Sequence, residues 1–154
     1  MAKASGLAAI LALLVFALDK YIKFLFLDGF VWHSDIISLY LVINKGVAFS
    51  MFAFLGESLK YIQVALVLAL LVFVYREKEF FIKNCVAIGI LFGAGCGNIS
   101  DRFFQGGVVD YIAWHYGFEF AVFNFADIMI NFAVFLIVLK MIFDKNNKFF
   151  CKKS

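Results

Sequence analysis

Three aspartates, one arginine and two asparagines lie within residues 97–127 of an otherwise apolar sequence. In chain order, these are Asn98, Asp101, Arg102, Asp110, Asn124 and Asp127. Charged groups are costly inside a membrane and commonly mark functional sites. Asp110 and Asp127 have no cationic neighbour close by in the sequence. Two carboxyl groups in a poorly hydrated site share a proton, so one can take a proton from water while the other protonates a scissile amide. The two residues therefore predict an acid pair that hydrolyses a peptide bond.

The composition places this chemistry in a membrane protein. The 154 residues are 65% hydrophobic and 16% charged, whereas a soluble domain is about half apolar. The apolar segments predict four transmembrane helices, at about residues 6–27, 59–76, 84–101 and 120–143. We expect one integral membrane domain over residues 1–154, with outer loops at 28–58 and 102–119.

The first outer loop has the pattern of a small sheet. Residues 36–43 are rich in β-branched and aromatic side chains and predict a strand. A turn is expected at residues 44–46, followed by a returning strand over 47–55. An open sheet edge cannot lie in hydrocarbon, so this part should rest on the membrane surface.

Charge distribution predicts the orientation. Nine of the 14 Lys and Arg residues fall on the side of the two termini, and the positive-inside rule then places both termini in the cytoplasm. With four spans, every unusual polar residue falls in one layer near the outer leaflet. This layer should hold Asp19 and Lys23 from the first span, the polar residues of 97–127 and the 44–46 turn.

Spacing also predicts which polar residues pair. The Asp19–Lys23 pair and the acid pair each have a plain structural alternative. Asp19 and Lys23 are four residues apart and can pair on one helix face, or Lys23 can extend to the interface with Asp19 as a compensating acid. We expect Asp101 and Arg102 to form a structural clamp, because a carboxylate paired with a permanent cation is a poor proton shuttle. For the acid pair, the alternative is that one aspartate caps a helix and the other is solvated.

Metal chemistry is not indicated. His33 and His115 lie far apart, and three cysteines fit neither a zinc site nor a disulfide framework. We expect no metal, no cofactor and no nucleic-acid partner.

Four blocks of the sequence resemble bacterial lipoprotein signal peptidases, the type II signal peptidases. They are Asp19 with Lys23, the segment 44–50 (NKGVAFS), the segments 98–102 (NISDR) and 107–110 (GVVD), and the segment 123–127 (FNFAD). The resemblance implies catalytic roles for Asp110 and Asp127. It implies supporting, substrate-binding roles for Asn44, Gly46, Asn98, Asp101, Arg102, Asn124, Asp19 and Lys23. Departures from the family pattern include Lys20 in place of glutamine and Tyr111 in place of phenylalanine.

The resemblance also implies a fold and a substrate. The expected fold is an all-α membrane protein of four transmembrane helices, with a sheet that cradles substrate in the first outer loop. A short surface helix is expected in the second outer loop, within residues 114–120. The expected substrate is a lipid-modified prolipoprotein, cut N-terminal to its diacylglyceryl cysteine by an aspartic peptidase. The expected protein is a monomer in the lipids of the bacterial cytoplasmic (inner) membrane.

A small proton-coupled transporter or channel is the competing interpretation, because membrane acids also relay protons. A relay needs ionisable groups through the membrane depth. The inner half of every predicted span lacks an acid, which favours the peptidase.

Overall fold

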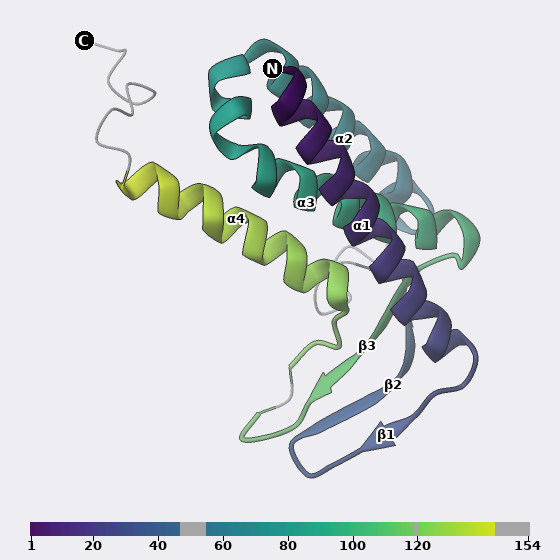
Figure 1. Cartoon of the computed structure of the whole chain (residues 1–154). Coiled ribbons are helices and arrows are strands. Elements are labelled where there is room, and N and C mark those ends of the chain that lie inside the picture. Colours follow the sequence, from purple (N-terminus) through teal and green to yellow (C-terminus); the bar gives the residue numbers. More distant parts are fainter. Residues whose placement is uncertain (47–54, 119, 144–154) are drawn as a thin grey trace.

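The computed structural model of the chain describes residues 1–46, 55–118 and 120–143. Its elements follow the order α1 (Ala2–Leu27), β1 (Trp32–His33), β2 (Ile37–Asn44), α2 (Ser58–Arg76), α3 (Lys78–Phe104), β3 (Val108–Trp114) and α4 (Phe125–Phe143). The helices gather at one end of the molecule and the three strands extend from the other (Figure 1). The prediction of a mainly helical protein with a small sheet is confirmed.

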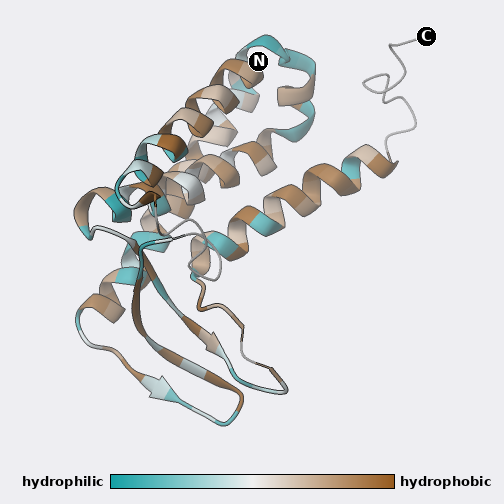
Figure 2. Ribbon diagram, turned by 180° about the vertical axis from the view of Figure 1, so that it is seen from behind, coloured by the Kyte–Doolittle hydropathy of each residue, from teal (hydrophilic) through white to brown (hydrophobic). Residues whose placement is uncertain are grey.

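Among the described residues, three helices are long and apolar enough to cross a bilayer, namely α2, α3 and α4. Most of their ribbon has the brown colour of hydrophobic residues (Figure 2). Leu66 of α2 and Phe135 of α4, for example, are large and exposed, as lipid-facing residues would be. α1 is a single helix over the first predicted span, and its passage through a membrane stays a prediction.

α3 starts earlier than the sequence indicated. The connection expected between the second and third spans is reduced to Glu77, and α3 begins at Lys78. Asn84 has non-helical backbone angles, φ −115° and ψ 16°, inside α3. Its side-chain Nδ2 donates to the Phe80 carbonyl at 3.0 Å. α3 is therefore kinked at Asn84, as is usual where the hydrogen bonding of a helix is interrupted.

α4 starts later than expected, at Phe125 instead of residue 120. The segment before it is held by the sheet. The Ile112 N–H donates to the Phe123 carbonyl at 2.8 Å, and the Phe123 N–H donates to the Ile112 carbonyl at 3.1 Å. Because these backbone groups are already paired across to β3, they are not free to form a helical turn.

The sheet has the order β1-β2-β3, with both neighbouring pairs antiparallel. β2 confirms the strand predicted over 36–43. Its partner β3 comes from the second outer loop, with Val42 opposite Asp110 and Asn44 opposite Val108. The strand predicted over 47–55 lies almost wholly outside the described residues.

The surface helix expected within residues 114–120 does not occur in the described part of that segment. β3 extends to Trp114, and bends follow at residues 116–118. The physical reason is pairing: Trp114 is paired with Ile37 of β2, and the His115 N–H donates to the Ile36 carbonyl oxygen at 2.9 Å. The backbone at the start of the expected helix is therefore already bonded to β2 and the residue before it.

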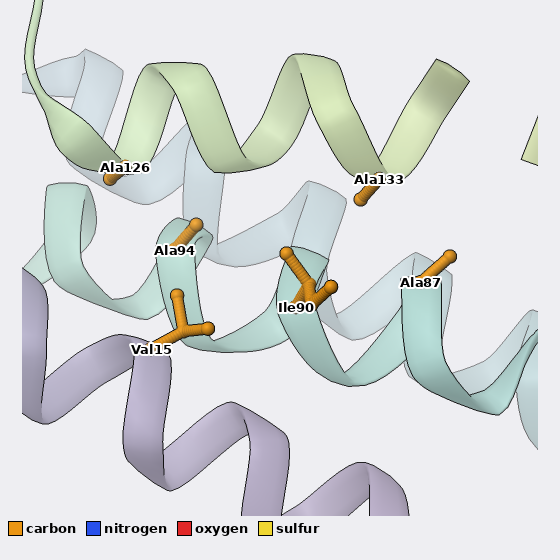
Figure 3. Packing of buried hydrophobic residues seen from close by; sticks show 6 residues of the cluster. All are labelled: Val15, Ala87, Ile90, Ala94, Ala126 and Ala133. Carbon is orange, nitrogen blue, oxygen red and sulfur yellow. The ribbon is translucent and has the colours of Figure 1, made fainter. Parts of the chain in front are cut away.

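α3 lies between α1 and α4 and contacts both through small residues. A Cβ atom at Gly89 would lie 2.5 Å from the Ala8 carbonyl oxygen of α1, so the two helices meet backbone to backbone. On the opposite side, Ala87 and Ala94 of α3 face Ala126 and Ala133 of α4 (Figure 3). Gly93 makes a second close approach of this kind, to the backbone of Ala12 in α1.

Candidate active site

The predicted polar residues converge where the helices meet the sheet. The buried polar and charged side chains in this region are Asp19, Lys23, Asn98, Asp101, Arg102, Asp110 and Asn124. They come from α1, α3, β3 and the residue before α4. Their meeting in space is as predicted, although it joins segments more than 70 residues apart in the chain.

Lys23 is the centre of a buried charge cluster. Its Nζ lies 2.8 Å from Asp19 Oδ2 and 2.7 Å from Asp101 Oδ2. The predicted Asp19–Lys23 pair is therefore confirmed. The alternative, a lysine extending to the interface, is wrong, because Lys23 is 0% exposed. Gly97 of α3 makes room for this cluster, since a Cβ there would collide with the Asp19 carboxylate.

The expected clamp between Asp101 and Arg102 is wrong as a pair. Asp101 Oδ1 instead accepts from Lys20 Nζ at 2.6 Å, and its Oδ2 accepts from the Val109 N–H at 3.3 Å. Arg102 donates to the carbonyl oxygen of Gly46. Adjacent residues on a helix point about 100° apart, so Asp101 faces α1 while Arg102 holds the end of the β2 turn.

Asp110 is fixed by two asparagine side chains. Asn44 Nδ2 donates to its Oδ2 at 2.9 Å, and Asn124 Nδ2 donates to its Oδ1 at 2.6 Å. The antiparallel register places Asn44 and Asp110 diagonally on one face of the sheet. Burial, together with the neighbouring charge of Asp127, raises the pKa of Asp110 to about 6 against the lowering effect of the two amides.

Asp127 lies in the first turn of α4 and takes part in a reciprocal cap. Its backbone N–H donates to Asn124 Oδ1 at 2.9 Å, while the Asn124 N–H donates to Asp127 Oδ2 at 3.1 Å. This is the geometry of a capping box. The second carboxylate oxygen, Oδ1, accepts from Asn98 Nδ2 at 2.9 Å. Capping of a helix was the structural alternative for Asp127. The cap uses only one of its two carboxylate oxygens, Oδ2.

Both acids border a single cavity of about 470 Å³. Its polar lining includes Asn44, Asn98 and Arg102, and its apolar lining includes residues 120–123 and Ile128 and Ile130 of α4. Gln63 of α2 also lines it. The sequence analysis did not single out Gln63, although an amide within an apolar predicted span was the available signal.

The chain is similar to known proteins over most of its length. A family model described as Signal peptidase (SPase) II matches residues 11–143. The chain belongs to the signal peptidase II family. Among curated relatives, it is 53% identical to a lipoprotein signal peptidase of Wolinella succinogenes over 133 residues, or 86% of this chain and 91% of the relative. It is 49% identical to the lipoprotein signal peptidase of Helicobacter acinonychis over 136 residues, or 88% of this chain and 87% of the relative.

Solved structures resemble the whole fold of this signal peptidase II family member. One is a bacterial membrane enzyme solved by the in meso method at 2.3 Å resolution, with a TM-score of 0.74 and 27% identity over 93% of this chain and 92% of that chain. A second, solved at 1.9 Å resolution, has a TM-score of 0.71 and 25% identity over 91% of this chain and 95% of that chain. Both support the arrangement of helices around the sheet end.

Proposed function

We propose that this chain is an aspartic peptidase that removes the signal peptide from lipid-modified prolipoproteins. The cut falls N-terminal to the lipid-bearing cysteine, and Asp110 and Asp127 act as the acid/base pair. The observation that carries this proposal is the position of Asn124 between the two acids. It donates to Asp110 through its side chain and to Asp127 through its backbone, and the two acids line one cavity.

The chemistry needs one proton shared between the two carboxyl groups. One ionised carboxylate takes a proton from water as the water oxygen attacks the carbonyl carbon of the scissile amide. The other carboxyl donates its proton to the amide nitrogen as the C–N bond breaks. Asp110 is suited to hold the shared proton because burial raises its pKa to about 6.

Asparagine amides are suited to support this exchange. Each acid receives at least one N–H donor from an amide, at 2.6–2.9 Å. These donors have no charge of their own and cannot take the proton away. They favour the ionised form of whichever acid has released its proton.

The proposed placement in the membrane follows the same geometry. α1 packs along α3 through glycine contacts, which supports α1 as a fourth span beside the three apolar helices. The site then lies at the outer leaflet of the bacterial cytoplasmic membrane, with both termini in the cytoplasm. A monomer suffices, because one chain supplies both acids.

The direct test is conversion of a purified lipidated prolipoprotein to its mature form by Asp110→Asn and Asp127→Asn variants. General acid–base groups contribute about a hundredfold to ten-thousandfold to a rate, and we expect turnover to fall by at least this much in each variant. Asp35→Asn is the matched control, because Asp35 is exposed in the first outer loop. Turnover near the wild-type rate in either cavity variant would reject the acid pair.

A further inference from the structure

Gln63 is an exception on its helix. Between Tyr61 and Tyr75, the sequence of α2 is otherwise entirely apolar. An amide in such a span is costly unless it is hydrogen-bonded. A polar residue within a membrane span therefore needs a hydrogen-bond partner. The identity of that partner indicates what the residue does.

No residue of the described chain satisfies the Gln63 amide oxygen. Its Oε1 is buried and accepts no hydrogen bond from any described residue. The same side chain lines the cavity that contains Asp110 and Asp127. It is the cavity's lining residue from α2 within the described ranges 1–46, 55–118 and 120–143. The unpaired acceptor thus lies in the wall of the cavity that the two acids line.

The chemistry of an acceptor selects its partner. A carboxamide oxygen needs an N–H or O–H donor. The ester carbonyls of a diacylglyceryl group only accept hydrogen bonds, so they cannot pair with Oε1. An extended polypeptide presents main-chain N–H groups at regular intervals, and outside a helix these need acceptors in a water-poor site.

We propose that Gln63 is a substrate-binding residue whose Oε1 accepts a hydrogen bond from a main-chain N–H of the extended signal-peptide segment. This contact rests on the proposed function and names a further residue for the same site. It places one polar anchor on α2, in the cavity that the apolar residues 120–123 also line. Because the contact is made to the main chain, it tolerates varied signal-peptide side chains.

The first experiment is steady-state kinetics of Gln63→Met with a purified lipidated prolipoprotein. Loss of one hydrogen bond predicts a rise in KM of about three- to tenfold, with kcat within about twofold of wild type. Leu66→Met is the matched control, because Leu66 is 65% exposed on the same helix and does not line the cavity. If Gln63 had only a structural role, Gln63→Met should have a lower melting temperature than wild type. We expect an unchanged or higher one, because the substitution removes an unpaired buried acceptor.

The second experiment identifies the donor. A series of lipidated substrate peptides carries a single ester in place of one main-chain amide, at successive positions N-terminal to the cut. Each ester removes one N–H. One position should raise KM for the wild-type protein by about the same factor as Gln63→Met and raise it no further in the variant, since both changes break one bond.

Two results would overturn the contact. One is a Gln63→Met protein with wild-type KM. The other is an ester series in which every position has the same effect in wild type and variant. Wild-type cleavage of the unmodified substrate in the same assay tests the proposed function separately, so failure of the Gln63 contact and failure of the peptidase assignment give different results.

Discussion

Lys23 Nζ donates a hydrogen bond to Asn98 Oδ1 at 2.8 Å, and this contact determines which end of the Asn98 amide faces the acids. Asn98 Oδ1 also accepts from Asn124 Nδ2 at 3.2 Å. With its oxygen occupied twice, the Asn98 amide can only present N–H to Asp127. Lys23 is therefore a positioning residue that acts on Asp127 through Asn98.

The other two asparagines are oriented in the same way. The Gly46 N–H donates to Asn44 Oδ1 at 2.9 Å, and the Asp127 N–H donates to Asn124 Oδ1. Each amide oxygen is thus occupied by a group that can only donate. Each amide nitrogen is left to donate to a carboxylate.

The first prediction concerns Lys23. Lys23→Met should lower kcat about tenfold or more, because Asn98 is then free to turn its oxygen toward Asp127. The decisive measurement is a double-mutant cycle with Asn98→Ala. If Lys23 acts through Asn98, the double variant should be no slower than Asn98→Ala alone.

The alternative explanation is that Lys23 acts on Asp127 through its positive charge. The double-mutant cycle distinguishes this from an effect through Asn98. The other charged groups of the described site are Lys20, Arg102, Asp19, Asp101 and Asp110. If Lys23 acted by charge alone, the losses from the two substitutions would multiply. Asp19→Asn combined with Lys23→Met controls for folding, because it removes one buried acid along with the cation that neutralises it.

The second prediction is a pH effect at Asp110. Its pKa is raised to about 6, and the Asn44 amide lowers it from a still higher value. The wild-type kcat/KM should fall as the pH rises through about 6, because the pair then loses its shared proton. Asn44→Ala removes the lowering contact, raises the pKa of Asp110 further and should move this alkaline limb to higher pH.

The pH at which the limb falls is the informative quantity, since Asn44→Ala can also change the maximum rate. Asn131→Ala is the matched control. Asn131 lines the same cavity, but its Nδ2 donates to the Asp127 backbone carbonyl. The alkaline limb of kcat/KM in Asn131→Ala should fall at the same pH as in wild type. An alkaline limb at unchanged pH in Asn44→Ala would contradict the assignment of this limb to Asp110.

The third prediction concerns the contact between α1 and α3. A Cβ atom at Gly93 would lie 3.0 Å from Ala12 Cα and 3.0 Å from Val15 Cβ. Gly93→Ala should therefore lower the free energy of unfolding by about 1–3 kcal/mol through overpacking. Gly95→Ala offers a control two residues away, because its Cβ would meet only Val67 Cγ2 at an ordinary 3.8 Å. Thermal unfolding in detergent should show a lower melting temperature for the first variant and an equal or higher one for the second.

The fourth prediction concerns Tyr111, a departure from the family pattern. Its hydroxyl oxygen accepts a hydrogen bond from the Phe125 N–H at 3.0 Å, and its ring stacks on Phe26 with centroids 4.1 Å apart. Tyr111→Phe should keep the stacking and lose the acceptor, at a cost of about 1 kcal/mol in stability. Tyr116→Phe, at an exposed ring, should leave the melting temperature unchanged. Equal melting temperatures for the two variants would show that the hydroxyl does not hold the start of α4.

Local geometry accounts for what the sequence predicted correctly. Asp19 and Lys23 pair because residues four apart share a face of any helix, whatever surrounds that helix. β2 forms where β-branched and aromatic residues are concentrated. The acids belong to motifs with a distinct local pattern, so Asp110 and Asp127 could be named as candidates before any fold was known.

Local residue patterns were thus enough to predict the class of the protein, the main helices, one strand and the identity of the polar residues. The pairing of these residues follows only from the folded chain. Asp101 meets Lys20 and Lys23 rather than Arg102, β2 pairs with β3, and Gln63 reaches the cavity of the acids. Such contacts depend on how far one helix can approach another and on which strand edge is left open. Those distances arise from packing across the whole chain, and no short segment of the sequence contains them.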